Sequence, residues 1–377
     1  MEYSNLTNLK RENKDCINLN PLQTAGKLTE PAKKALIEFG DGYSICDFCS
    51  GTLDEIEKPP IKTFTNEILP KFLGCDIVRI TNGAREGMFM IMHALTDPKD
   101  TILLDDNAHY SCIVAAERCK LNIIKVPNSK CPIDAIDVTL YEPYIKKHKP
   151  KLIFLTYPEG NYGNLPDAKK LGKIAKKYNV PYAINCAYSI GRMPVNMKEL
   201  GADFVVASGH KSMSASGPIG LIGMDKKYED RVLGKSKEYP KKVIECLGCT
   251  SRGATIATMM ASFPEVEKRV KNWDEELKKA QWFAGELEKL TFVLIGQKPH
   301  RHDLMYFKTD ILYKISEKHK KRGYFLYREL KKRGIIGIKP GHTKSFKLST
   351  YGIPKEDLEK VISAFKEIID ENKKLLD

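Results

Sequence analysis

Residues 203–213 read Asp203-Phe204-Val205-Val206-Ala207-Ser208-Gly209-His210-Lys211-Ser212-Met213. The apolar run from Phe204 to Ala207 is typical of a strand that is buried on both faces. Small and polar residues follow this run at once, which predicts that the strand ends there. Lys211 then lies at the mouth of a sheet, where its amine is suited to form a Schiff base with a bound carbonyl group.

Apolar runs alternate with amphipathic stretches through the first 290 residues of the chain. Further strands are predicted at Ile77–Ile80, Thr101–Leu104, Asn122–Val126, Lys151–Thr156, Pro181–Asn185 and Ile219–Met224. Helical patterns between the strands cover Glu86–Leu95, Asp134–His148 and Ala168–Tyr178. This alternation, with continuous apolar strands, predicts an α/β fold with a mostly parallel, helix-covered sheet. Ligands of such sheets bind beyond the carboxyl ends of the strands.

The length of 377 residues is more than one hydrophobic core usually supports. We predict an N-terminal segment and a large ligand-binding domain over residues 1–280, and a small C-terminal α+β domain over residues 281–377. Thr29 is predicted to cap a first helix. A long helix, Pro264–Leu290, is predicted to end the large domain and lead into the small one. The shorter elements after it are strands Phe292–Ile295, Leu304–Phe307 and Ser345–Ser349, helix Tyr324–Lys332, and a last helix from Pro354.

Lysine and arginine number 62 against 48 acidic residues, a net charge of +14, which favours a polyanionic partner such as nucleic acid. The basic segments Lys318–Arg322 and Lys331–Arg333 are our candidates for that contact. The sequence has no apolar run long enough for a transmembrane helix, and its start lacks the apolar core of a secretory signal. We therefore expect a cytoplasmic protein without a membrane partner, in which the ten cysteines stay reduced.

A second motif, Thr81-Asn82-Gly83-Ala84-Arg85-Glu86-Gly87, follows a predicted strand and opens a helix. Backbone N–H groups at the start of a helix attract anions, and a glycine lets a phosphate approach closely. Arg85 adds a guanidinium group to the same turn. The motif alone is equally compatible with an ordinary structural connection.

Three further segments follow predicted strands and carry polar or aromatic side chains. His109-Tyr110 comes after one strand, and its imidazole is suited to stack on a flat ring; the glycine-rich loop Tyr157–Asn164 follows another. Asn185 ends a third strand. Each segment alone also fits an ordinary loop or turn. Together with Lys211 and the anion-binding turn, they supply every group that pyridoxal phosphate (PLP) needs: an amine, a phosphate cradle, a ring partner and a partner for the pyridine nitrogen.

In these motifs the sequence resembles the fold-type I PLP enzymes, on the branch of the cysteine desulfurases and selenocysteine lyases, and more closely the family of O-phosphoseryl-tRNA:cysteinyl-tRNA synthases. The resemblance also includes Cys46-Asp47-Phe48-Cys49, Asn185–Pro194, Gly217–Gly220, Cys249 and Ser251–Gly253. It implies that Lys211 binds PLP covalently, that His109 stacks on the ring and that Asn185 faces the pyridine nitrogen. The residues that it implies at the phosphate are Ala84, Arg85, Ser208 and His210.

The resemblance implies conversion of O-phosphoseryl-tRNA(Cys) to cysteinyl-tRNA(Cys), by β-elimination of phosphate to dehydroalanyl-tRNA and addition of sulfur. Lys211 would move the Cα proton, while Arg85, His109 and Tyr110 would steer the leaving phosphate. The implied partners are a second copy of the chain, a sulfur donor and the phosphoseryl-tRNA synthetase. Most fold-type I enzymes have an aspartate where this chain has Asn185. A neutral amide predicts a weaker electron sink, which β-elimination tolerates because phosphate is a good leaving group.

The family resemblance points to Cys46, Cys49 and Cys249 as sulfur carriers, with a persulfide on Cys249 that Cys46 and Cys49 attack. The alternative role for these three cysteines is to hold an iron–sulfur cluster. Cys246 forms a second Cys-x-x-Cys pair with Cys249 but does not match the family pattern. A structural zinc site built from both pairs is disfavoured, because the ligand pairs of zinc sites usually lie close together in sequence. We predict no other metal site.

Two other functions remain open from the sequence. An enzyme like the cysteine desulfurases or selenocysteine lyases would act on a free amino acid, but it needs a mobile cysteine in a C-terminal loop, and this chain has no cysteine after Cys249. A tRNA-binding scaffold without catalysis would not need Lys211 or the anion-binding turn.

Overall fold

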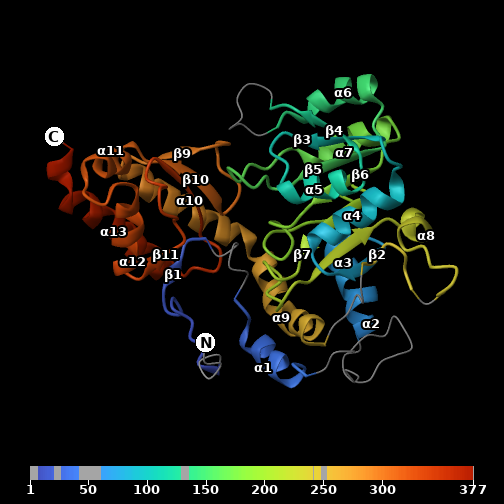
Figure 1. Cartoon of the computed structure of the whole chain (residues 1–377), viewed down its shortest axis with the longest axis horizontal. Helices are drawn as coiled ribbons and strands as arrows, with labels where there is room; N and C mark the ends of the chain where they lie inside the picture. Colours follow the sequence, from blue (N-terminus) through green and yellow to red (C-terminus); the bar gives the residue numbers. More distant parts are fainter. Residues whose placement is uncertain are drawn as a thin grey trace, which may run out of the picture. The chain divides into compact units, whose positions relative to one another are not determined.

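The computed structural model of the chain describes residues 7–20, 27–41, 61–128, 136–240, 242–247 and 253–376 (Figure 1). The chain divides into two compact units. The large unit comprises Ala25–Glu275 and Gly296–His302, and the small unit comprises Met1–Thr24, Glu276–Ile295 and Asp303–Asp377. Within the described ranges, no helix combines the length and the apolar character needed to cross a membrane.

A seven-stranded sheet of order β2-β8-β7-β6-β5-β3-β4 forms the centre of the large unit. Its strands are β2 (Ile77–Thr81), β3 (Thr101–Asp105), β4 (Asn122–Val126), β5 (Leu152–Thr156), β6 (Tyr182–Asn185), β7 (Phe204–Ser208) and β8 (Gly220–Met224). Each predicted strand is present, with its ends within one residue of the prediction. Every residue of β5, β6, β7 and β8 is buried, which explains why their sequences are continuously apolar.

The strands β3, β4, β5, β6 and β7 run parallel, and β8 is antiparallel to both of its neighbours, β7 and β2. β2 therefore points the same way as the parallel strands. The carboxyl ends of all these strands meet at one edge of the sheet, and β8 begins there. The predicted α/β fold with a mostly parallel sheet is confirmed.

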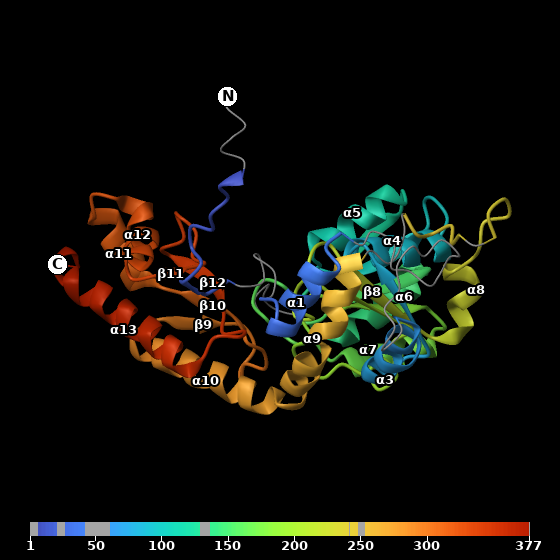
Figure 2. The same ribbon diagram turned by 90° about the horizontal axis from the view of Figure 1, so that it is seen from below.

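Helices lie on both sides of this sheet; in Figure 2, α4 and α5 are on one side and α3 and α7 on the other. The helices of the large unit are α1 (Glu30–Glu38), α2 (Ile61–Thr63), α3 (Leu69–Leu73), α4 (Ala84–Leu95), α5 (Tyr110–Arg118), α6 (Tyr141–His148), α7 (Ala168–Lys177), α8 (Glu229–Val232) and α9 (Gly253–Lys271). Short π or 3-10 segments are η2 (Phe64–Ile68), η3 (Val138–Leu140) and η4 (Lys226–Tyr228). The predicted cap of α1 is confirmed, because the Thr29 hydroxyl accepts a hydrogen bond from Ala32 N at 3.2 Å.

The small unit is an α+β structure with its own core. Its antiparallel sheet has the order β12-β10-β9, and a short parallel pair joins β1 to β11. The strands are β1 (Ile17–Asn18), β9 (Val293–Ile295), β10 (Leu304–Lys308), β11 (Ile335–Ile336) and β12 (Ser345–Ser349). The helical segments are α10 (Trp273–Lys289), α11 (Asp310–Lys318), η5 (Arg322–Tyr324), α12 (Phe325–Lys332), α13 (Lys355–Glu371) and η6 (Lys373–Leu375). Phe292 packs edge-on against Phe365 at 5.3 Å between ring centroids in this core.

The prediction of one long helix from Pro264 to Leu290 is wrong. Two helices, α9 and α10, occupy this region and are separated at Asn272. The structure places Pro264 inside α9, whose buried face extends back through Ile256 and Met259.

The predicted boundary at residue 280 also differs from the division in the structure, which falls after Glu275. Ala280 of α10 belongs to the core of the small unit, and this places the start of that unit before residue 281. The described N-terminal strand β1 also belongs to the small unit, since Ile17 pairs with Ile335 and packs against the same core.

Candidate active site

The segments predicted to carry the chemistry meet at one edge of the large unit's sheet. Thr81 at the end of β2 and Ser208 at the end of β7 both pair with Gly220 at the start of β8. Asn185 at the end of β6 pairs with Thr156 of β5, and the opposite edge of β6 pairs with β7. The sheet thus brings together the anion-binding turn, Asn185 and the lysine segment, which are far apart in the sequence.

Lys211 lies in a tight turn just after β7. Its backbone N–H donates to Ser208 O at 3.2 Å, and its carbonyl accepts from Ser214 N at 3.1 Å. Its side chain is half-buried, and Nζ lies 4.4 Å from the centroid of the Tyr188 ring. A cation over an aromatic face is attracted to the ring, so Tyr188 helps to hold the amine at the edge of the sheet.

Helix α9 fixes the turn that carries this lysine. Arg269 donates from Nε and Nη2 to Gly191 O at 3.0 and 2.6 Å, and Nη2 also donates to Ser212 O. Gly191 has φ +79°, and a Cβ there would lie 2.8 Å from the Ser212 carbonyl carbon, so only glycine fits this contact. Sequence reasoning gave Arg269 no role, because one arginine on an amphipathic helix has the pattern of an exposed charge.

The anion-binding turn opens helix α4 as predicted. Gly83 is the N-cap residue with φ +127°, and a Cβ built there would have no neighbour within 4 Å. Among the described residues, no group accepts a hydrogen bond from the backbone N–H of Ala84 or Arg85. The Arg85 side chain is exposed beside this open helix start. Free N–H groups, open space and a guanidinium together suit a phosphate.

Glu86 connects this turn to a second segment of the chain. Its carboxylate is buried and accepts from the backbone N–H and the side-chain Nδ2 of Asn82, the latter at 2.9 Å. It also accepts from Leu247 N at 2.7 Å. Two turns further along the same face of α4, His93 Nδ1 contacts Glu245 Oε2 at 2.9 Å. The segment 242–247 is therefore tied to helix α4 at two points.

Aromatic side chains join the anion-binding turn to Lys211. The ring of His109 lies 4.4 Å from that of Tyr110, and the Arg85 guanidinium carbon lies 5.3 Å from the Tyr110 centroid. A Cβ at Gly160 would lie 3.6 Å from Tyr188 and 4.0 Å from His109, so the glycine-rich loop lies against both rings. The structure thus groups Arg85, His109 and Tyr110, as the sequence predicts, and adds Tyr188.

Hydrogen bonds at Nδ1 of His109 and His210 indicate which ring nitrogen carries the proton when each ring is neutral. Nδ1 of His109 accepts from Ser111 N at 3.3 Å, so the neutral ring carries its proton on Nε2. Nδ1 of His210 lies 3.0 Å from Ile219 O and must donate to it. Burial, with a further contribution from the Lys211 charge, lowers the pKa of His210. His210 therefore favours a neutral ring whose Nε2 is an acceptor, and it must gain a proton before it donates to a phosphate.

Asn185 is buried at the same edge in a setting with little fixed negative charge. Its Oδ1 accepts from Ala187 N at 3.2 Å, and its Nδ2 lies 3.7 Å from Cys112 Sγ. Asp105, a carboxyl whose charge acts on Cys112, accepts from Thr156 N at 2.8 Å. Burial raises the pKa of Asp105 to about 7, so near neutral pH a large fraction of this carboxyl is protonated.

Comparison with known proteins identifies the family. A family model described as "O-phosphoseryl-tRNA(Sec) selenium transferase, SepSecS" matches residues 62–370. This chain belongs to the SepSecS family. Curated relatives include the O-phospho-L-seryl-tRNA:Cys-tRNA synthase of Methanosarcina acetivorans, 53% identical over 96% of this chain and 95% of the relative. That of Methanocaldococcus jannaschii is 52% identical over 98% and 99%. The resemblance seen in the sequence is confirmed.

Solved structures agree with the SepSecS assignment. A chain of a SepCysS–SepCysE N-terminal domain complex superposes with a TM-score of 0.91 at 48% identity, covering 98% of this chain and 99% of that one. A cysteine desulfurase from Thermococcus onnurineus NA1 superposes with a TM-score of 0.73 at 17% identity, over 94% and 95%. That second likeness shows the shared fold alone. The SepSecS family consists of fold-type I, PLP-dependent transferases, so the predicted fold and enzyme class are confirmed.

The site fits the cofactor of the SepSecS family. PLP needs an amine, which Lys211 offers, and a phosphate site, which the open start of α4 offers at Ala84 and Arg85. His109 presents a flat ring beside Gly160, and Asn185 presents a neutral amide at the end of β6. These placements use residues that meet at one edge of the sheet.

The cysteine predictions fall on residues outside the described ranges. Cys46, Cys49 and Cys249 all lie there, so their roles as persulfide carriers or iron–sulfur ligands stay predictions. Cys246 is described; it is half-buried, and burial raises the pKa of its thiol to about 11. In the part of the chain that the structure describes, no group of three or more His, Cys, Asp or Glu side chains is placed to hold a metal ion.

Proposed function

We propose that this chain converts O-phosphoseryl-tRNA(Cys) to cysteinyl-tRNA(Cys) by PLP-dependent replacement of phosphate with sulfur. The observation that carries the proposal is the placement of Lys211 and an open anion-binding turn at one edge of the sheet, in a chain that is 53% identical to a synthase named for this reaction. PLP, when bound, accepts the electron pair that is released when the substrate Cα loses its proton.

The side chains at the sheet edge have separate tasks in this reaction. Nζ of Lys211 takes the Cα proton, and the Cβ–O bond then breaks so that phosphate leaves with the electron pair. Arg85, with Tyr110 beside it, binds the departing dianion, and His109 lies next to both. After sulfur attacks Cβ, Lys211 returns a proton to Cα. The Tyr188 ring, whose centroid lies 4.4 Å from Nζ, holds this amine at the edge of the sheet where the substrate would bind.

The sulfur step is assigned to the cysteines that the resemblance identifies. A persulfide on Cys249 would supply sulfur, and attack by Cys46 or Cys49 on its inner sulfur would form a disulfide and release sulfide. An iron–sulfur cluster on the same three cysteines is the alternative. The proposal includes an external sulfur donor, a homodimer with active sites at the subunit interface, and the phosphoseryl-tRNA synthetase as a further partner. A protein like the SepCysE of the similar complex is another partner to test.

The experiment that tests the function offers the purified, PLP-loaded protein two substrates. We expect cysteinyl-tRNA from phosphoseryl-tRNA(Cys) and sulfide, measured by gel separation of the aminoacyl-tRNA after reaction with a thiol reagent. Free cysteine should release little sulfur by comparison. Efficient desulfuration of free cysteine, without conversion of the tRNA, would instead identify a desulfurase-like enzyme. Tight binding of the tRNA with neither reaction would identify a scaffold.

Substitution of Asn185 by aspartate tests the proposed neutral partner of the pyridine nitrogen. The new carboxylate would stabilise the protonated form of the ring nitrogen, so we expect a shifted visible spectrum and more side reaction such as transamination. A second buried carboxyl close to Cys112, on which the Asp105 charge already acts, should also lower the melting temperature. The measurements are the absorbance spectrum, the product ratio and thermal unfolding. An unchanged spectrum and product ratio would exclude this role for Asn185.

A further inference from the structure

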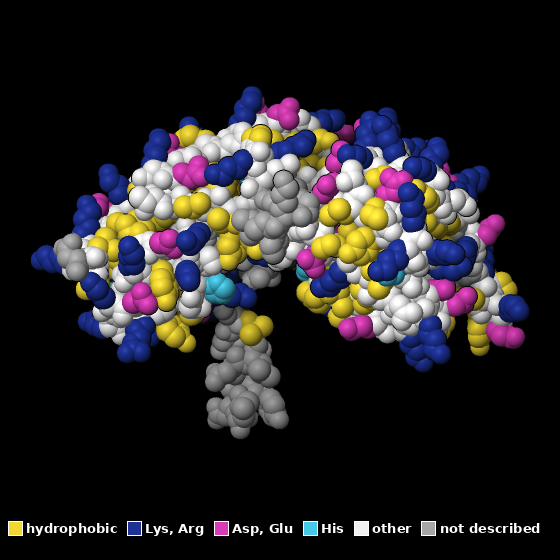
Figure 3. Space-filling model, turned by 90° about the horizontal axis from the view of Figure 1, so that it is seen from above, with side chains coloured by type: hydrophobic (Ala, Val, Ile, Leu, Met, Phe, Trp, Pro, Cys, Tyr) yellow, Lys and Arg dark blue, Asp and Glu magenta, His cyan; other side chains and the backbone are white. Residues whose placement is uncertain are grey.

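Helices α6 and α7 and the strand start between them hold a dense group of lysines. Residues 141–178 contain nine lysines and three acidic residues, a net charge of +6 within a chain of +14. All nine lysine side chains are exposed. Figure 3 views the molecule from the side on which α6 lies, and Lys and Arg side chains are spread over the surface of both units there.

Packing explains why these lysines face outward. In α7, Ala168, Leu171 and Ala175 are buried, whereas Lys169, Lys173 and Lys176 recur at helical spacing on the opposite side. Helices α6 and α7 contact each other, so their exposed sides form one surface. We call its seven members the lysine face: Lys147, Lys149, Lys151, Lys169, Lys170, Lys173 and Lys176.

The lysines of the lysine face have no ion-pair partner among the residues that the structure describes. Within this region, Glu142 accepts from Lys177 at 2.8 Å and lies 3.6 Å from Lys146. Among the described residues, no carboxylate lies within 4 Å of the amine of any lysine of the lysine face. A group of like charges that repel one another gains most from a partner that supplies many negative charges.

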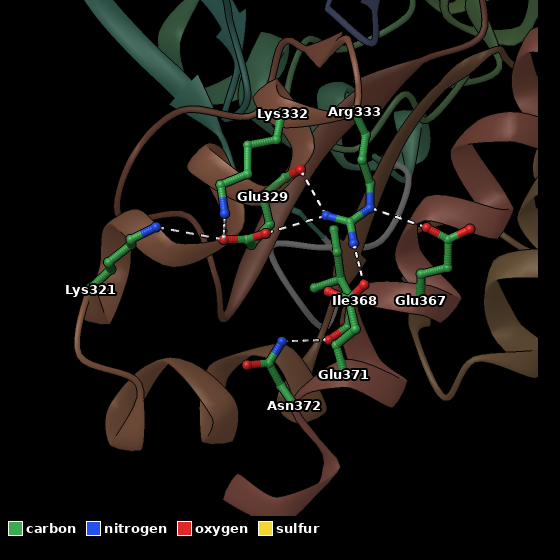
Figure 4. A network of polar contacts seen from close by, with 8 residues as sticks. All are labelled: Lys321, Glu329, Lys332, Arg333, Glu367, Ile368, Glu371 and Asn372. Carbon is green, nitrogen blue, oxygen red and sulfur yellow. Dashed lines mark hydrogen bonds and ion pairs between the residues drawn. The ribbon is translucent and has the colours of Figure 1, made fainter.

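One of the two C-terminal basic segments predicted for this role, Lys331–Arg333, differs in that respect. Figure 4 shows Arg333 bound to Glu329, Glu367 and Glu371, the last two at 3.2 and 2.7 Å. Lys332 pairs with the same Glu329 at 2.8 Å. Lys331 pairs with Glu12 at 2.8 Å. Carboxylates of the same unit thus neutralise most of the charge of the segment Lys331–Arg333. A partner would meet less positive charge there than the sequence suggests.

The lysine face begins beside the candidate site. The glycine-rich loop that lies against His109 leads directly into Asp167, the N-cap of α7. Lys169 and Lys170 occupy the first turn after this cap. The helix then runs away from the site edge for about 15 Å, at a rise of 1.5 Å per residue. A nucleic acid whose end enters the site from this side would pass along the lysines.

We propose that the lysine face binds the phosphate backbone of the tRNA body while the aminoacylated end occupies the site beside Lys211. This inference rests on the proposed function and adds the surface that the substrate uses. Exposed lysines bind phosphates as point charges and release counterions, so the contact depends strongly on salt and little on base sequence.

The test is charge reversal with a matched control. The variant Lys169→Glu, Lys173→Glu, Lys176→Glu is compared with Lys318→Glu, Lys320→Glu, Arg322→Glu, which changes the net charge equally at the other predicted segment. We measure the binding of unacylated tRNA(Cys) at several salt concentrations, independently of turnover. In the α7 variant we expect the dissociation constant to rise by about tenfold or more, and the salt slope to fall by about 2 to 3.

The outcomes separate this inference from the proposed function. Unchanged tRNA binding by the α7 variant, in a protein that still converts phosphoseryl-tRNA, would overturn the lysine face and leave the function standing. An equal loss in both variants would also overturn it, because net charge alone would explain the effect. If the wild-type protein neither binds nor converts the tRNA, the proposed function itself fails. Circular dichroism and melting temperature confirm that both variants fold.

Discussion

Replacing Lys211 with alanine is expected to remove the visible absorbance of the PLP-loaded protein and to lower the rate of cysteinyl-tRNA formation by at least about 10²–10⁴-fold, the range that proton transfer by a positioned side chain supplies. The reason is geometric. Lys211 is the amine that the turn after β7 holds over Tyr188 at 4.4 Å. Single-turnover conversion of phosphoseryl-tRNA and the absorbance spectrum measure the two effects separately.

The control for this substitution is Lys226→Ala, which removes an exposed lysine of the same unit. It should leave the spectrum, the rate and the melting temperature unchanged. A Lys211→Ala protein that keeps both its colour and its rate would show that another amine binds the cofactor. A protein that loses its colour but keeps its rate would show that the Cα proton is moved by another group.

Much of the fold follows from local sequence because the strands are buried on both faces. The run Phe204–Ser208 has no polar side chain before its last residue. Its pattern therefore predicts a strand buried on both faces and also the position at which that strand ends. The same break places Lys211, and the equivalent breaks place Asn185 and the turn at Gly83. Since all these strands point one way, the sequence also predicts that these residues meet at one edge.

Contacts between distant segments explain what the sequence missed. Arg269 lies 78 residues from Gly191, and no local pattern marks their hydrogen bond. Arg333 reads as part of a basic run, but its partners Glu367 and Glu371 arrive from α13. Charge in a sequence is counted residue by residue, whereas the charge that a surface offers depends on the pairs that form after folding.

Glu86 is a residue of the active site whose long-range contacts the sequence also does not reveal. Its substitution is expected to have the second of the two largest effects. The sequence places it in the anion-binding turn without a task of its own. In the structure, its carboxylate accepts hydrogen bonds from Asn82 on one side and from Leu247 N at 2.7 Å on the other. The segment that ends at Leu247 continues toward Cys249, so Glu86 joins the start of the phosphate site to the chain that leads to a predicted sulfur carrier.

Substitution of Glu86 by glutamine is expected to weaken PLP binding by about tenfold or more and to lower the melting temperature. Glutamine keeps one acceptor oxygen, but its NH₂ group replaces the other. Buried donors of Asn82 or Leu247 then face a donor, and each unsatisfied group costs about 1–3 kcal/mol. Glu117→Gln, an exposed substitution with the same charge change on α5, is the control.

Two measurements distinguish positioning by Glu86 from a general loss of stability. The dissociation constant of PLP, from titration of its absorbance, reports on the turn at Asn82. The concentration of a small-molecule persulfide, which can transfer its outer sulfur to a thiol without an oxidant, at half-maximal rate in protein saturated with PLP reports on the segment that ends at Leu247. Positioning of both segments predicts that both values rise in the Glu86 variant at temperatures well below its melting transition. If the melting temperature falls while both values stay at the wild-type level, Glu86 stabilises the fold and does not position the site.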